Sequence, residues 1–183
     1  MSLPIEPQVW SRKRFMISTD PTLLSLSAIN KAFGEEFIYW ARPVPEDVLQ
    51  GIIDNSFCFG LYELPEASTE NAPIHEGKST CGVGKDMKQI GFARLVGDKV
   101  TFAYLTDLYV LPAYQGFGLG GWLIDCVGEV LKPLPHLRWT MLRTSVEKSQ
   151  ESYEKRLGMA VLKSGHISDG PVMMGRKGVA GGP

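Results

Sequence analysis

The sequence predicts a single α/β domain, a mixed α+β sheet of about seven mainly antiparallel strands with four helices on both faces. The length of 183 residues is typical of one domain, and 44% hydrophobic with 21% charged residues is typical of a globular protein. Strand-like and helix-like segments follow one another in the order β-α-α-β-β-β-α-β-α-β-β, which indicates a sheet covered by helices.

The domain is expected to span residues 14–176. Residues 1–13 are expected to be an irregular N-terminal segment because two prolines stand close together there. Residues 177–183 end in Gly-Gly-Pro and are expected to form a flexible tail. The first strand is predicted at Arg14–Ser18.

Two helices are predicted after the first strand. Asp20 and Pro21 are typical of an N-cap and a first helical position, and the apolar period continues until Gly34. The second helix begins at Pro45 and has acidic residues in its first turn, which suit the positive end of a helix dipole. The loop between the two helices, Glu35–Pro45, is rich in aromatic residues.

Three strands are predicted in the middle of the chain. Ser56–Glu63 is dense in Phe and Tyr, while Gln89–Val96 and Val100–Val110 flank Gly97-Asp98, a dipeptide typical of hairpin turns. Residues 65–88 are polar and lack an apolar period, so we expect a mobile loop inside the domain.

The remaining elements lie toward the C-terminus. A helix with a full apolar stripe is predicted from about Leu119 to Pro133, and a short helix at Ser149–Leu157 is closed by Gly158. The last strands are predicted at Arg138–Thr144, Ala160–Lys163 and Val172–Arg176.

A glycine-rich run precedes the third helix and is the strongest functional signal. Residues 115–121 read Gln-Gly-Phe-Gly-Leu-Gly-Gly, so four of the seven residues lack a side chain that would keep a ligand off the backbone. The following helix directs its free N–H groups and positive dipole end at the same place. The run therefore predicts an anion site, most naturally for a phosphate or pyrophosphate.

The run also satisfies the dinucleotide pattern G-x-G-x-x-G, which the context argues against. That pattern begins at the end of a strand, whereas Leu111–Gln115 intervene here. A ribose-binding carboxylate is expected about 20 residues further on, and His136–Met141 contains none. No Lys-Ser/Thr pair follows the glycines, so a P-loop is excluded as well.

Two separated segments, residues 115–120 and residues 153–159, together resemble the motifs of the GCN5-related N-acetyltransferase (GNAT) family, particularly small bacterial and fungal members of unassigned substrate. Gln115-x-x-Gly118-x-Gly120, after a strand ending in Val110, is similar to the family's Arg/Gln-x-x-Gly-x-Gly/Ala acetyl-CoA motif. Residues 153–159, Tyr-Glu-Lys-Arg-Leu-Gly-Met, are similar to its Tyr-x-x-x-Gly-Phe/Met segment. The element order also matches, so residues 14–176 are expected to form one N-acetyltransferase domain.

The resemblance implies acetyl-CoA as acyl donor and assigns residues to it. Backbone N–H groups of Gln115, Gly116, Phe117, Gly118, Leu119, Gly120 and Gly121 would hold the pyrophosphate. The strand segment Leu108, Tyr109 and Val110 would pair with the pantetheine arm as if it were an added strand. Gln115 stands where the family often has Arg, so phosphate binding would depend more on backbone amides.

The resemblance also supplies catalytic candidates. Tyr153 would protonate the departing thiolate as general acid, the alternative being a packed aromatic residue. Asp107 would accept a proton from the amine through water or fix a cationic amine, and a plain surface carboxylate is an open alternative. Tyr39 and Trp40 would form a wall of the acceptor pocket, or simply pack under their loop.

The composition limits the binding partners and the cellular location that we expect for this protein. A net charge of −1 offers no basic excess for nucleic acid, and no run approaches the ~20 apolar residues of a membrane span. The three cysteines are widely spaced and no histidines have metal-ligand spacing, so neither a disulfide framework nor a metal is expected. We expect a cytoplasmic protein, and short edge strands leave a homodimer open.

The sequence thus favours an enzyme that transfers acetyl from acetyl-CoA directly to a primary amine of a small molecule or peptide. No cysteine has a nucleophile's setting with a histidine partner, which favours direct attack. Two alternatives remain open, a non-catalytic CoA-binding regulatory module and a nicotinamide-dependent oxidoreductase.

Overall fold

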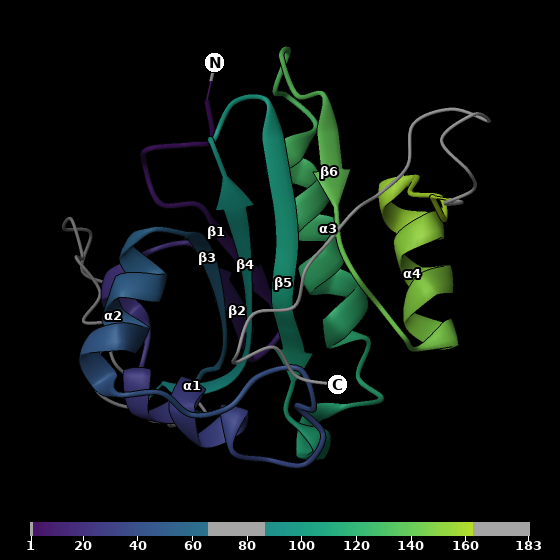
Figure 1. Cartoon of the computed structure of the whole chain (residues 1–183). Helices are drawn as coiled ribbons and strands as arrows, with labels where there is room; N and C mark the ends of the chain where they lie inside the picture. Colours follow the sequence, from purple (N-terminus) through teal and green to yellow (C-terminus); the bar gives the residue numbers. More distant parts are fainter. Residues whose placement is uncertain (1, 66–86, 163–183) are drawn as a thin grey trace, which may run out of the picture.

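The computed structural model describes residues 2–65 and 87–162, which form one sheet with helices on both faces (Figure 1). Six strands lie in the spatial order β1-β2-β3-β4-β5-β6, and all neighbours are antiparallel except β5 and β6, which are parallel. The predicted mixed, mainly antiparallel sheet is confirmed, with six described strands where about seven were expected. The strands are β1 (Val9–Arg12), β2 (Phe15–Ser18), β3 (Phe57–Glu63), β4 (Lys88–Gly97), β5 (Phe102–Val110) and β6 (Trp139–Met141).

Within the described ranges the sheet is accompanied by four α-helices and two short 3₁₀ helices. The helices α1 and α2 cover one face of the sheet, while α3 covers the other and α4 lies beside α3 (Figure 1). These elements are η1 (Pro21–Leu23), α1 (Leu26–Phe33), α2 (Glu46–Asp54), η2 (Pro112–Tyr114), α3 (Leu119–Leu131) and α4 (Glu147–Leu157). The predicted placement of four helices on both faces is confirmed.

Alternation along the strands explains the two layers of core. On β3, Cys58 packs with the helices α1 and α2, whereas its neighbour Phe59 packs with α3. Successive strand residues point to opposite faces, so each buried strand serves both layers. The α3 stripe predicted from the sequence, including Leu123 and Val127, is fully buried against the sheet.

The N-terminal segment differs from the prediction, because Val9–Arg12 forms β1 inside the region expected to be irregular. It pairs with β2 through a tight turn at Lys13, whose φ is 53°. Only Trp10 of this strand is partly buried, stacking on Phe59 and donating its indole N–H to Glu129 on α3 at 2.7 Å. A strand with so little buried surface leaves no hydrophobic alternation in the sequence.

The first predicted helix is split into η1 and α1. Asp20 caps η1 by accepting from the Thr22 N–H at 2.9 Å, and Leu24 is extended. Ser25 then caps α1 by accepting from the Ala28 N–H at 3.2 Å. Two N-caps in close succession start two separate helices.

The C-terminal predictions are only partly met. β6 is shorter than the predicted strand Arg138–Thr144, and residues 160–162 form no strand. Lys163, the strand predicted at Val172–Arg176, the tail 177–183 and residues 66–86 of the predicted loop lie outside the described residues. Gly158 closes α4 in the left-handed conformation with φ 64°, as expected.

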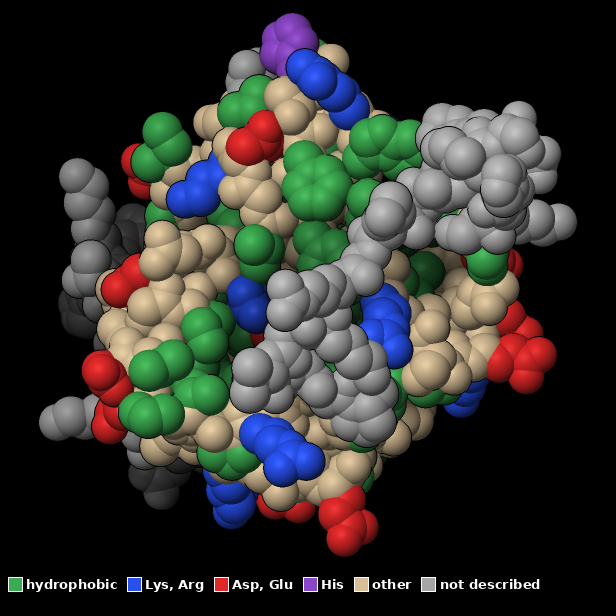
Figure 2. All heavy atoms as spheres, in the orientation of Figure 1, with side chains coloured by type: hydrophobic (Ala, Val, Ile, Leu, Met, Phe, Trp, Pro, Cys, Tyr) green, Lys and Arg blue, Asp and Glu red, His purple; other side chains and the backbone are tan. Residues whose placement is uncertain are grey.

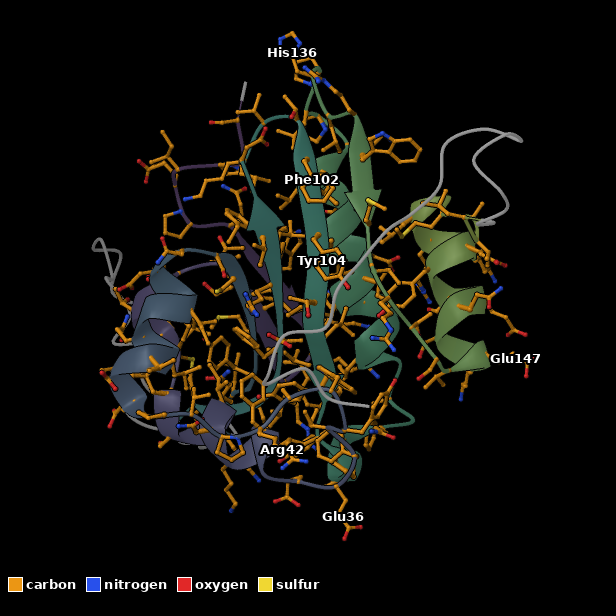
Figure 3. The ribbon with its side chains drawn as sticks, viewed as in Figure 1. Glu36, Arg42, Phe102, Tyr104, His136 and Glu147 are labelled. Carbon is orange, nitrogen blue, oxygen red and sulfur yellow. The ribbon has the colours of Figure 1, made fainter. Side chains whose placement is uncertain are left out.

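The helices α1 and α2 leave the upper part of their face of the sheet open. Phe102 and Tyr104 of β5 lie there (Figure 3), and Figure 2 shows hydrophobic side chains gathered over the same area. Phe102 is 36% exposed. No helix in the described ranges has the length and apolar character needed to cross a bilayer.

Candidate functional site

Among the described residues, the C-terminal half of β5 has a free edge. β6 pairs only with Phe102–Tyr104 and the chain then departs toward α4, so within the described ranges no strand lies beside residues 105–110 on that side. The Leu111 N–H donates to Ile90 of β4 at 2.8 Å, so the adjoining Val110 carbonyl faces the opposite, free side. The Gln115 side chain donates to this carbonyl at 3.1 Å. Such an edge can pair with another extended chain.

A β-bulge interrupts the pairing of β5 with β4 within this C-terminal half of β5. Phe92 of β4 pairs with Tyr109 and Arg94 pairs with Thr106, so Asp107 and Leu108 together oppose one residue. Asp107 has a φ of 53°, a left-handed conformation that Asp and Asn tolerate better than most residues. Bulges redirect side chains and are frequent beside functional sites.

Asp107 is buried and paired. Its Oδ2 accepts from the Arg94 Nε at 2.5 Å, while its Oδ1 accepts from the Thr106 hydroxyl at 3.3 Å. Arg94 also donates to the Ser56 hydroxyl at 3.1 Å. Only 7% of Asp107 and 19% of the Arg94 side chain are exposed, so each depends on the other to compensate for lost hydration.

Cys58 lies close to this ion pair, but its thiol lacks the properties of a nucleophile. Burial raises the pKa of its thiol to about 12, and the nearby Asp107 carboxylate adds to the rise. The Cys58 side chain is therefore a protonated thiol at neutral pH, whereas only the thiolate form of a cysteine is nucleophilic.

The glycine run presents a set of free backbone donors. The Gln115 N–H is taken by the Pro112 carbonyl at 3.1 Å, but among the described residues the N–H groups of 116–121 have no acceptor. Gly116 and Gly118 have φ values of 88° and 73°, and a Cβ on either would meet nothing within 4 Å. α3 begins with no side-chain cap and no acidic residue in its first turn. The geometry and polarity of the run therefore suit an anion.

Tyr153 lies on the face of α4 that packs against the core. Burial raises the pKa of its phenol, and nearby Tyr39 adds to the rise. Four residues separate Tyr153 from Gly158, one more than in the family's segment, yet the side chain still points inward. Tyr153 is thus a neutral phenol over the physiological pH range.

Tyr39 forms a contact between two segments that are far apart in the sequence. Its hydroxyl shares a hydrogen bond with Ser145, so the loop between α1 and α2 contacts the segment that leads into α4. Its ring packs edge-on against Trp40 at 5.1 Å between centroids, and the Trp40 indole nitrogen is buried with no partner in the described chain. The structure therefore brings the predicted pocket wall to the predicted acid.

The sequence did not identify Arg94 as part of this site, and it did not predict the contact between Ser145 and Tyr39. Arg94 had a readable signal, because it is the only charge inside the apolar segment Gln89–Val96. The contact between Ser145 and Tyr39 had no local signal, because the two residues are 106 positions apart along the chain. The described contacts put Tyr153 with Tyr39 and Asp107 with Arg94, as two separate groups.

Known proteins resemble the chain in sequence and fold. Residues 50–159 match the family described as "Acetyltransferase (GNAT) family". A protein of Gibberella zeae, named provisionally as an acetyltransferase, is 39% identical over 155 residues, 84% of each chain. A structure from Xanthomonas campestris pv. campestris, provisionally named a GNAT acetyltransferase, is 28% identical with a TM-score of 0.60 and covers 89% of this chain and 92% of its own. A Staphylococcus aureus structure at 17% identity, covering 89% of this chain and 99% of its own, shares the fold with a TM-score of 0.57.

Proposed function

The chain belongs to the GNAT family of acetyltransferases, and we propose that it transfers acetyl directly from acetyl-CoA to a primary amine of a small molecule or peptide. One observation carries the proposal: in the part of the chain that the structure describes, the free edge of β5 adjoins a glycine run with unused backbone donors. An extended arm and a diphosphate are the two parts of coenzyme A that these features suit.

The residues present fit this donor. The N–H groups of Gly116 to Gly121 would bind the diphosphate, while the Gln115 N–H is already used. Leu108 and Val110 would pair with the pantetheine arm. Because the Gln115 side chain now bonds to the Val110 carbonyl, donor binding would replace that bond.

The chemistry would divide among three groups. When bound, the donor supplies a thioester whose carbonyl gains negative charge and whose sulfur leaves with an electron pair. A backbone N–H at the bulge beside Leu108 would stabilise that charge, and Tyr153 would donate its proton to the sulfur. Asp107 would accept the amine's proton through water at Oδ1, since Arg94 holds Oδ2. Tyr39 and Trp40 would border the acceptor.

A donor and acceptor screen tests the proposal. Acetyl-CoA should raise the melting temperature, whereas NADH should not, and a panel of amines should release free thiol from acetyl-CoA. Tight coenzyme A binding with no turnover on any amine would favour the non-catalytic binding module. Stabilisation by NADH alone would instead favour the oxidoreductase.

Gly118→Ala should weaken donor binding more than it weakens folding. The left-handed φ of 73° costs Ala about 1 kcal/mol, and the added Cβ enters the open space proposed for the diphosphate. We expect roughly tenfold weaker acetyl-CoA binding by calorimetry. Gly51→Ala is the matched control, because this residue lies inside α2 with nothing within 4 Å of the new Cβ. It should add up to about 1 kcal/mol of stability with unchanged affinity, and equal affinities for both variants would contradict the assignment.

A further inference from the structure

Arg156 of α4 lies against the first turn of α3. A Cβ on Gly121 would stand 2.6 Å from Arg156 Nη2 and 2.9 Å from its Nε, so the guanidinium occupies the space that a side chain there would need. The other end of the guanidinium donates from Nη1 to Asp125 at 2.6 Å. Arg156 thus has one edge toward a carboxylate and another toward the glycine run.

Besides its ion pair with Asp125, the Arg156 guanidinium lies beside backbone dipoles that an anion would offset. The first turn of α3 carries the positive end of the helix dipole and contains no acidic residue. The run 115–121 has no Lys or Arg of its own, so its backbone dipoles alone would face a doubly charged diphosphate. The side chains of Arg156 and Asp125 are 36% and 44% exposed. A ligand therefore has access to the guanidinium.

We propose that Arg156 binds the diphosphate of the acyl donor, supplying from α4 the positive charge that the glycine run lacks. Its Nη2 and Nε would donate to phosphate oxygens held by the α3 N–H groups, while Asp125 fixes the guanidinium through Nη1. A side chain at position 121 would have to displace the guanidinium from this place. This inference rests on the proposed function.

The role of Arg156 is tested by measuring the coenzyme A affinity of four proteins: the wild type, Arg156→Met, Asp125→Asn and Lys155→Met. Arg156→Met should bind about tenfold to hundredfold more weakly. Asp125→Asn keeps an oxygen acceptor but removes the opposing charge, so its affinity should be unchanged or higher. Lys155, the exposed neighbour on α4, is the matched control and should show wild-type affinity.

The possible outcomes distinguish a failure of the role proposed for Arg156 from a failure of the proposed function. Equal losses of affinity in Arg156→Met and Asp125→Asn would mean that the ion pair only supports the α3–α4 packing, which overturns the proposal. The loss in Arg156→Met should persist with dephospho-CoA, and its disappearance there would overturn the assignment to the diphosphate. Wild-type affinity in Arg156→Met overturns it as well. Failure of the wild type to bind coenzyme A would instead refute the proposed function.

Discussion

Tyr153→Phe is expected to lower kcat by about 100-fold or more, the range found when a general acid is removed. The change deletes one hydroxyl and keeps the ring that packs α4 against the core, so the fold should be retained. Burial and neighbouring Tyr39 raise the pKa of this phenol above its ordinary value of 10.0. Because a raised pKa keeps the proton on, the wild-type rate should fall only above pH 10.

The pH–rate profile is the decisive measurement. Tyr153→Phe should lack the alkaline fall that the wild type shows, and its residual rate should stay flat there. Tyr104→Phe is the matched control, because Tyr104 lies on the face of β5 with no role assigned to its hydroxyl (Figure 3). An undiminished kcat in Tyr153→Phe would leave Tyr153 as a packed aromatic residue only.

Arg94→Met is expected to destabilise the fold by about 3 kcal/mol, because it leaves the buried Asp107 carboxylate without its partner. For a domain of this size the melting temperature should fall by roughly 6–12 °C. Adding Asp107→Asn removes the unpaired charge and should restore most of the loss. Asn also tolerates the left-handed φ of 53°, so no backbone strain is added.

The same variants separate the two roles of Asp107. If Asp107 accepts the amine's proton, the double variant should be stable yet slow, with kcat reduced by about 100-fold at neutral pH. If it only supports the bulge, stability and kcat should recover together in the double variant. Thermal denaturation and acetyl transfer measured on one preparation would distinguish these results.

Local sequence signals predicted most of the elements. The apolar stripe predicted α3, Gly158 predicted the end of α4, and the glycine run predicted a helix start with free N–H groups. Each signal acts within one or two turns of chain, where residue type limits the backbone directly. β1 was missed because its partial burial depends on Phe59 and Glu129, which come much later in the sequence.

The sequence by itself determined the turn geometry of residues 115–121 and the helix start within them, since glycine conformations and a helix N-terminus are local properties. Only the tertiary structure decided what surrounds that run and the half-open strand beside it. It paired Asp107 with Arg94, joined Tyr39 to Ser145 and laid Arg156 over Gly121. Charges and hydroxyls find such partners through strand register and helix packing, and residues from distant segments set both.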